Sequence, residues 1–313
     1  MQEKNNIDNK VQYQNYGNSN DIKGDEKMQQ AYKAAAKMNS KIIEETDPEG
    51  FKYLKEVSNS DIIITRGIYD HGEVVFELCQ IPYSLINPDE IERIELRDDQ
   101  IIFVNCPGHI TTRGLDRIKS FVHNGGMLVT TDWALTNVLE RNFQEMVKFN
   151  SRSTADDVVR VVFEKVDDTF LSGLLDPNDE PVWWLEGSSY PIQVLNKDKV
   201  KILVSSKEMK EKYGESPIVV TFEYGLGKVY HMTSHFYLQR SETRSKRHEQ
   251  VGSNYASMKG MNMDEFSTEE KDAIEKTNVA QMEAAYTSTR TLSNMIMEQK
   301  KRVHERNKGK KDE

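Results

Sequence analysis

Short apolar runs alternate along the first half of the chain with segments whose apolar residues recur at helical spacing. The pattern is clearest in residues 99–143. Residues 101–104 (IIFV) and 127–131 (MLVTT) are short runs typical of strands that are buried on both faces. Between them, residues 115–122 carry apolar side chains at a helical period, and a Gly-Gly pair follows where a helix would end. This order predicts a βαβ unit of a parallel sheet.

The same alternation continues on both sides of this unit. A run at residues 61–65 precedes it, followed by a short helical pattern at 74–79 and another run at 81–86. Further runs lie at residues 158–163, 182–185, 192–195, 200–204, 218–222 and 229–232. The last two flank a Gly-containing turn and therefore predict a hairpin. We expect an α/β fold with a mostly parallel, doubly wound sheet, added antiparallel strands in the second half, and helical N- and C-terminal extensions.

Composition divides the chain into three parts. Residues 1–50 begin with a polar stretch, expected to be disordered up to about residue 27, and continue into a peripheral helix over residues 28–45. Residues 51–240 hold the predicted α/β domain. Residues 241–313 would form a linker up to residue 263, a long helix and a basic tail.

The predicted C-terminal helix starts at a capping-box sequence, Ser-Thr-Glu-Glu at residues 267–270, and contains no Gly or Pro before about residue 306. Its large apolar residues form only a thin stripe. Most helix stability comes from packing, so such a helix is marginal on its own. We therefore expect it to pack against another polypeptide, in a homo-oligomer or a larger assembly. The residues predicted to make this contact are Leu292, Met295, Ile296 and Val303.

Charge and composition narrow the classes of function. The 313 residues have a net charge of -9, which argues against general nucleic-acid binding and leaves only the basic tail after Lys300 for such contacts. No apolar run reaches the roughly 20 residues of a membrane helix, and the N-terminus has no apolar signal region. The two cysteines make no disulfide framework, which is typical of a reducing compartment. We expect a soluble cytoplasmic protein with protein partners and no membrane contact.

Polar side chains gather where the predicted parallel strands end. Ligands of open α/β sheets bind outside these carboxyl ends. The candidate ligand-binding residues there are Arg66, Asp70, His71, Asn105, Cys106, Gly108, His109, Thr131, Asp132 and Trp133. An alternative stays open, in which these residues only cap helices and satisfy loop backbone; Asp132 would then be the N-cap of a helix over residues 133–143.

Metal binding is a further possibility at this edge. The side chains of His71, His109, Asp132 and His235 are of types that ligate zinc. Their spacing does not demand a metal, however, so we expect neither a metal nor another cofactor.

Three motifs in this order resemble the class I glutamine amidotransferase-like superfamily, which has a flavodoxin-like α/β fold. They are FVNCPG at residues 103–108, FVHNGGMLV at 121–129 and GLGKVYHMTSH at 225–235. In the enzymes, the corresponding segments form the oxyanion strand, the lead into the nucleophile turn, and the strand with the catalytic histidine. The resemblance covers residues 51–240 and implies that His235 takes the position of that histidine.

The chain departs from the enzymes of this superfamily at the catalytic positions. By this resemblance, Asp132 stands where the amidotransferases have their cysteine, and a carboxylate is a far poorer nucleophile toward an amide. Phe236-Tyr237 replaces the Pro-Glu that follows the catalytic histidine, so we expect the third triad member to be missing. Cys106 belongs to the oxyanion strand and does not restore the triad.

These departures place the chain with the non-catalytic branch, which it resembles through trehalose-utilisation-type and gliding-motility or intraflagellar-transport-type domains. We therefore predict a non-catalytic scaffold or adaptor that assembles through its terminal helices. The alternative is a small-molecule-binding sensor or a hydrolase that uses a pocket at the strand carboxyl ends. Asp132 and His235 would then be the acid/base pair, with Asn105 and backbone amides near Gly108 as hydrogen-bond donors.

Overall fold

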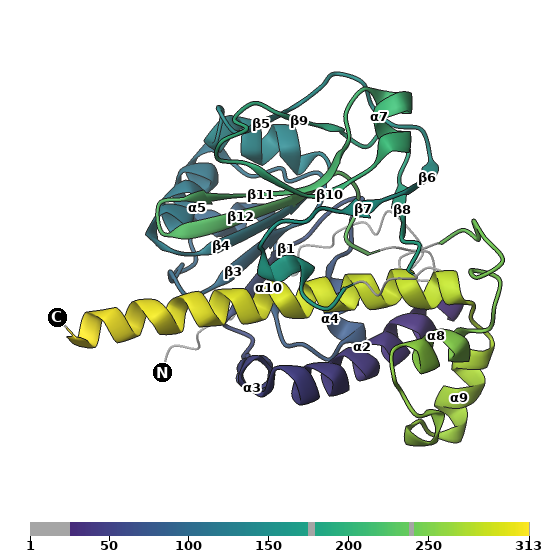
Figure 1. Cartoon of the computed structure of the whole chain (residues 1–313). Coiled ribbons are helices and arrows are strands. Elements are labelled where there is room, and N and C mark those ends of the chain that lie inside the picture. The colour runs from purple at the N-terminus through teal and green to yellow at the C-terminus, as the bar shows by residue number, and fades with distance from the viewer. Residues whose placement is uncertain (1–25, 175–178, 238–240, 313) are drawn as a thin grey trace, which may run out of the picture.

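An eight-stranded sheet lies at the centre of the computed structural model, which describes residues 26–174, 179–237 and 241–312 (Figure 1). The strand order is β2-β1-β3-β4-β12-β11-β10-β7. The first five of these strands are mutually parallel, and the pairs β12–β11, β11–β10 and β10–β7 are antiparallel. The predicted fold class is therefore confirmed, with the antiparallel strands in the second half of the chain.

Most of the strands coincide with apolar runs. The strands of the main sheet are β1 (Ile62–Thr65), β2 (Ser84–Ile86), β3 (Ile101–Val104), β4 (Met127–Thr131), β7 (Val162–Phe163), β10 (Lys201–Ser205), β11 (Pro217–Tyr224) and β12 (Gly227–Met232). Two small antiparallel sheets pair β5 (Val147–Phe149) with β9 (Ile192–Val194) and β6 (Asp157–Arg160) with β8 (Val182–Leu185).

Helices cover both faces of the main sheet. They are α2 (Glu26–Thr46), α3 (Pro48–Lys55), α4 (Glu73–Leu78), α5 (Thr112–Asn124), α6 (Glu140–Asn142), α7 (Lys207–Tyr213), α8 (Gly252–Met258), α9 (Thr268–Glu275) and α10 (Val279–Asp312). Single turns of 3₁₀-helix lie at Pro88–Glu92, Thr169–Leu171 and Met263–Glu265, and a π-helix lies at Leu135–Leu139.

Alternate residues of each central strand enter two separate hydrophobic cores, because side chains of a strand point to opposite faces. In β1 and β3, Ile62 and Phe103 join the core under α2, α4 and α10, whereas Ile63 and Ile102 join the core under α5 and the π-helix. Both faces are apolar, so the strands read as continuous apolar runs in the sequence. The two cores hold the carboxyl ends of β1, β3, β4 and β12 along one edge.

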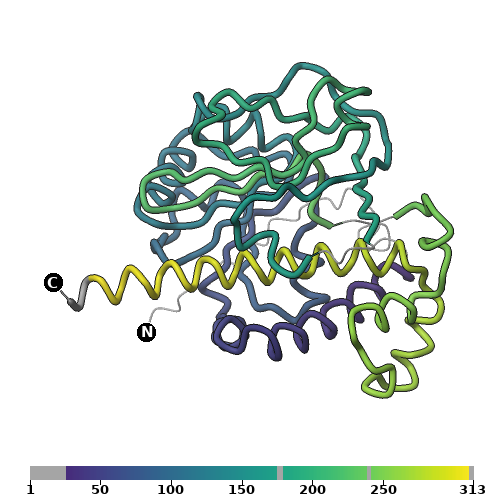
Figure 2. Tube along the Cα trace, in the orientation of Figure 1, coloured from purple at the N-terminus to yellow at the C-terminus, as the bar shows by residue number. Residues whose placement is uncertain are grey.

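Helix α10 packs against other elements of its own chain and runs along α2, as the yellow and purple segments of Figure 2 show. Leu292, Met295 and Ile296 are each at most 2% exposed and belong to the same core as the β1 and β3 side chains. The expectation that these three residues contact another polypeptide is therefore wrong. Val303, the fourth predicted contact, is half-buried.

Buried polar side chains explain why the thin apolar stripe was misleading. The amide nitrogen of Asn294 donates to the carbonyl oxygens of Phe170 and Ser172 at 3.0 and 2.8 Å. The amide nitrogen of Gln299 donates to the carbonyl oxygens of Gln100 and Gly125 at 3.2 and 3.1 Å. These polar positions are buried and hydrogen-bonded to loops of the same chain, so the buried surface of the helix is much wider than its apolar stripe.

Several local predictions need correction. The capping box at Ser267 is present, but α9 ends at Glu275 and a separate helix starts at Val279. The predicted linker contains α8, and the run at 158–163 forms two strands. The sequence patterns did not indicate β5 or α7.

Two further predictions lie at the N-terminus and after β4. The helix predicted at residues 28–45 is α2, and it is a core helix because Tyr32 and Met38 are fully buried. The segment predicted to be disordered lies almost wholly in residues 1–25, outside the described residues. The helix predicted after Asp132 is instead the π-helix followed by α6. Within the described residues, no helix is long and apolar enough to cross a membrane.

Candidate functional site

The carboxyl ends of β3 and β4 and the segment after β12 bring together a cysteine, an aspartate and a histidine. Cys106, Asp132 and His235 each offer one side-chain atom, and these three atoms lie within 4.8 Å of one another. We call this set, with the neighbouring carboxylates of Asp70 and Glu186, the strand-end cluster. Parallel strands end at the same edge of a sheet, which is why residues so distant in the sequence meet here.

Asp132 has a backbone conformation that residues other than glycine rarely adopt. Its φ angle is +45°, in the left-handed region. Its backbone N–H donates to the carbonyl oxygen of Met232 at 2.9 Å, which ties the turn to β12. Its carboxylate accepts a hydrogen bond from the backbone N–H of Tyr190 at 2.9 Å and lies 3.5 Å from Nε2 of His235. Asp132 therefore points into the cluster rather than capping the following helix, whose N-cap is Ala134.

His235 is held between two carboxylates. Its Nδ1 lies 3.2 Å from Oε1 of Glu186, and its backbone N–H donates to Oε2 of the same side chain at 3.2 Å. Its Nε2 faces Asp132. Burial opposes the charged imidazolium, but the nearby carboxylates of Glu186 and Asp70 and the interaction with Asp132 outweigh it, so the pKa of His235 is well above its usual value. The Pro-Glu that follows the histidine in the enzymes is absent, but another carboxylate, that of Glu186, lies next to Nδ1 of His235.

Asp70 is a member of the cluster and is almost completely buried. One oxygen, Oδ2, accepts hydrogen bonds from the Thr131 hydroxyl at 2.6 Å and from the backbone N–H of Phe236 at 3.3 Å. The other oxygen makes no hydrogen bond with the described residues. Burial raises the pKa of Asp70, and it likewise raises the pKa of Asp132. The cluster therefore holds carboxylates in a setting that disfavours their charge.

Cys106 is fully buried at the end of β3, next to a cis peptide bond with Pro107. Its backbone N–H donates to the hydroxyl of Thr131 at 3.1 Å. Its thiol is 3.8 Å from Oδ2 of Asp132. Burial, in spite of the neighbouring His235, raises the pKa of this thiol to about 11. The thiol is therefore protonated at neutral pH, which makes it a poor nucleophile.

Aromatic side chains flank the cluster on its outer side. Tyr190 stacks between Phe149 and Trp133, with ring centroids 3.9 and 5.5 Å apart, and Tyr69 meets Trp133 edge-on at 5.1 Å. We call these four residues the aromatic cover. Ile68 and Tyr69 on the adjoining loop are 55% and 52% exposed. The buried polar side chains of the cluster therefore adjoin partly exposed apolar side chains.

Other predicted site residues lie apart from the cluster or serve the backbone. His71 pairs with Glu73 at 3.3 Å, and the Asn105 side chain contacts Glu73 and the backbone of Gly72. Arg66 and His109 are exposed. Gly108, with φ +72°, packs against Ala134 and leaves no room for a Cβ. Asn105 is therefore occupied and is not a free donor to a ligand.

Glu186 and Tyr190 belong to the site but were not predicted. Both lie in the segment after β8, which the sequence gave no reason to place beside β4. Glu186 directly follows a strand, as the predicted site residues do, and that position is the one signal that was present.

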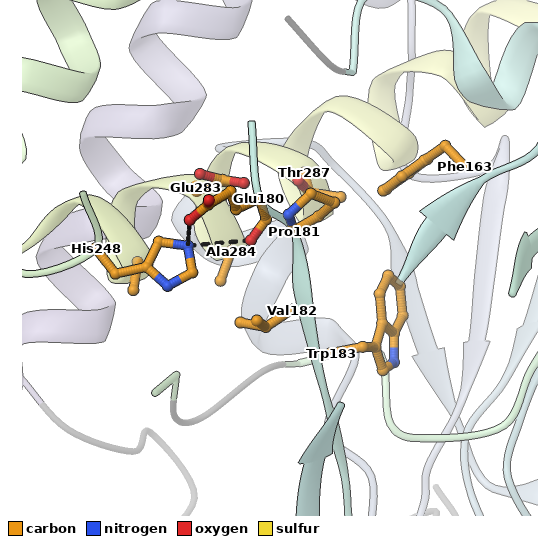
Figure 3. A pocket seen from close by; sticks show the side chains of 10 residues that line it. Phe163, Glu180, Pro181, Val182, Trp183, His248, Glu283, Ala284 and Thr287 are labelled. Atoms are coloured by element: carbon orange, nitrogen blue, oxygen red, sulfur yellow. Dashed lines mark hydrogen bonds and ion pairs between the residues drawn. The ribbon is translucent and has the colours of Figure 1, made fainter. Parts of the chain in front are cut away.

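A small cavity between β8, α10 and the segment before α8 is lined by apolar side chains together with a few polar ones (Figure 3). Nε2 of His248 is 3.0 Å from the carbonyl oxygen of Glu180 there. The cavity volume is about 10 Å³, the size of a single water site. It is therefore too small for a ligand.

Comparisons with known proteins yield only distant likenesses. No protein-family model matches this chain, and no curated protein matches it. Among solved structures, a β-galactosidase of Bacillus circulans sp. alkalophilus shows a TM-score of 0.40 at 12% identity, over 59% of this chain and 31% of its own. A cytoplasmic protein of Salmonella typhimurium LT2 shows 0.40 at 13%, over 56% and 89% of the two chains. A ThuA-like protein of Bacteroides uniformis shows 0.38 at 14%, over 57% and 81%.

The extent of these likenesses limits their use. In five glycosidase structures that it matches, this chain spans only 27% to 34% of the length of the glycosidase chain. The TM-scores and identities are low throughout, so no conclusion about activity rests on them. The function has to be argued from the strand-end cluster itself.

Proposed function

We propose that this chain is an amidotransferase-like protein without glutaminase activity, which binds a small molecule at the strand-end cluster. The observation that carries this proposal is the conformation of Asp132. A left-handed aspartate costs about 1–3 kcal/mol and persists only where its surroundings hold it, and such strain gathers at functional sites. Here β12, Tyr190 and His235 all hold Asp132 in place.

The absence of glutaminase activity follows from the positions of the thiol and the carboxylate. An amide is attacked by a thiolate that a histidine activates. In this chain the turn after β4 carries Asp132, and Cys106 at the end of β3 has a raised pKa of about 11. We therefore expect neither group to attack the amide of glutamine.

The site favours a ligand with hydrogen-bond donors or positive charge beside an apolar part. Three carboxylates, those of Asp70, Asp132 and Glu186, lie around one imidazole. The aromatic cover supplies apolar surface next to them, which is the usual composition of small-molecule sites.

The experiment is a thermal-shift screen of amines, amino acids, sugars and nucleotides against the full chain in the presence of a chelator. Compounds that raise the melting temperature are then tested against Asp132→Asn and against Asp116→Asn, an exposed aspartate on α5 that serves as the matched control. The proposal predicts that Asp132→Asn abolishes the shift and that Asp116→Asn keeps it. A ligand whose shift survives in Asp132→Asn, or no ligand in any class, would contradict it.

A scaffold or adaptor role is the second candidate, and one observation favours it. The C-terminal turns of α10 extend past the rest of the molecule (Figure 1). Lys301, His304 and Lys308 are exposed there, so this end of the helix suits an acidic protein partner. The contact surface would thus be this basic end of α10, which adjoins Val303, and not the buried part of the helix.

A pull-down from native cells, with light scattering on the purified chain, tests the adaptor role. The double variant Lys301→Glu with Lys308→Glu should lose the captured partner or the oligomer. Lys27→Glu with Lys33→Glu on α2 is a matched charge control and should keep it. Retention by the α10 variant, or a monomer that captures nothing, would remove this candidate.

A further inference from the structure

The strand-end cluster has the composition and spacing of a divalent metal site. We propose that Cys106, Asp132 and His235 bind a zinc-class cation, with a fourth position left for water or a ligand. This inference deepens the proposed function, because the ion would lie in the same site. It departs from the expectation of a metal-free chain.

The two distances from Asp132 to the other side-chain atoms are close to those around a tetrahedral ion. Oδ2 of Asp132 lies 3.5 Å from Nε2 of His235 and 3.8 Å from the sulfur of Cys106. Around zinc, with bonds of about 2.0–2.3 Å, neighbouring ligand atoms are about 3.3–3.7 Å apart. The third pair, the sulfur of Cys106 and the ring nitrogen of His235, lies within 4.8 Å, so these two side chains would approach each other by at most about 1 Å to share one ion. Thiolate, imidazole and carboxylate are also the three ligand types that zinc prefers in proteins.

The residues behind these side chains orient them as outer partners do in zinc sites. Oε1 of Glu186 lies 3.2 Å from Nδ1 of His235, and its Oε2 accepts from the backbone N–H of His235, so Nε2 is the ring nitrogen that faces the cluster. That Nε2 is buried and makes no hydrogen bond with the described residues. The backbone of Tyr190 holds Oδ1 of Asp132, which leaves Oδ2 facing the other two ligands. A carboxylate on the far nitrogen of a histidine is the usual way in which proteins fix a zinc ligand.

The charge balance also favours a cation. Asp70, Asp132 and Glu186 are carboxylates within one buried cluster, and Asp70 keeps one oxygen without a hydrogen bond among the described residues. In the part of the chain that the structure describes, the only cationic side chain paired with the cluster is the imidazole of His235. A divalent ion would compensate this negative charge, and on binding it would displace two protons to solvent, the thiol proton of Cys106 and the Nε2 proton of the His235 imidazolium.

Two of the three histidines that the sequence offered for zinc are not part of this set, and only His235 is. His109 is exposed, and His71 pairs with Glu73 on α4. The proposed metal site therefore has a cysteine in place of those two histidines, because the side chain that lies next to Asp132 is that of Cys106.

The test uses the full chain, stripped with a chelator and titrated with zinc chloride and with cobalt chloride. Cobalt bound through sulfur gives a charge-transfer band in the near-ultraviolet. We expect one ion per chain and a cobalt band that Cys106→Ser abolishes, while His235→Gln weakens zinc binding at least tenfold. Cys79→Ser, at the other cysteine, and His109→Gln, at the exposed strand-end histidine, are the matched controls and should bind as the wild type does.

X-ray absorption spectroscopy on the zinc-loaded wild type tests the proposal without a variant, so its result does not depend on whether the variants fold. The proposal requires one sulfur in the first shell, at about 2.3 Å, together with nitrogen or oxygen ligands. A first shell without sulfur, a cobalt band that survives Cys106→Ser, or no ion retained by the wild type would overturn it. If the metal proposal fails, the proposed function can still be tested, because the screen for organic ligands is done in the presence of a chelator.

Discussion

Glu283 on α10 gives the fold a pH dependence that one substitution can isolate. Its side chain is only 4% exposed and forms an ion pair with Arg247, which also contacts Asp179 at 2.8 Å. Lys259 contacts Asp179 from α8's end, and His248 and Glu180 lie on the same side of α10. Burial, opposed by Arg247 and reinforced by Asp179, raises the pKa of Glu283 from 4.5 to about 7.

The sign of the effect follows from proton linkage. Between the unfolded pKa of 4.5 and the folded value of about 7, the folded protein binds more protons than the unfolded chain. Stability therefore falls as the pH rises through this window. A difference of about 2.5 pH units corresponds to roughly 3 kcal/mol of unfolding free energy, as an order of magnitude.

Urea denaturation at pH 5, 6, 7 and 8 measures this contribution. Glu283→Gln cannot titrate, so its stability relative to the wild type should rise by up to roughly 3 kcal/mol between pH 5 and pH 8. The matched control is Glu275→Gln at the exposed end of α9, whose difference from the wild type should stay constant. A constant difference for Glu283→Gln would refute the reasoning, because Glu283 would then titrate alike in both states.

Two further predictions concern buried groups of α10 and β12. Ile296→Ala should lower the free energy of unfolding by about 2–5 kcal/mol, because this side chain is 1% exposed and lies in the core of its own chain. If the variant instead lost self-association and kept its stability in urea, α10 would pack against another polypeptide. Asp168→Ala should lower the free energy of unfolding by about 3–5 kcal/mol, because it removes one of the two carboxylates paired with buried Lys228. The control Asp167→Ala, at the exposed neighbouring residue, should lower it little. Equal losses of stability in calorimetry would contradict this prediction.

The sequence predicted the sheet well, because strands buried on both faces are continuous apolar runs. Residues 62–65, 101–104 and 127–131 are such runs, and each became a central strand. The packing of α10 against its own chain could not be predicted in the same way. Its buried polar residues, such as Asn294 and Gln299, look solvent-exposed until their loop partners are known.

The candidate site was predicted in part for a similar reason. The parallel strands fix where Cys106 and Asp132 end, so topology alone brought these two together. Glu186 and Tyr190 come from a segment whose position depends on the pairing of β6 with β8 and of β5 with β9. Those small sheets depend on long-range contacts, which local patterns do not encode.

The free energy of unfolding of Asp132→Asn tests the central claim most directly, since that claim makes the strand-end cluster a binding site rather than a structural ion pair. Asparagine tolerates the left-handed conformation, still accepts from Tyr190, and relieves the crowding of carboxylates around His235. The account predicts a loss of no more than about 1 kcal/mol, or a gain, because Glu186 still balances His235. A loss of about 3–5 kcal/mol, as expected when a structural buried ion pair is broken, would contradict it.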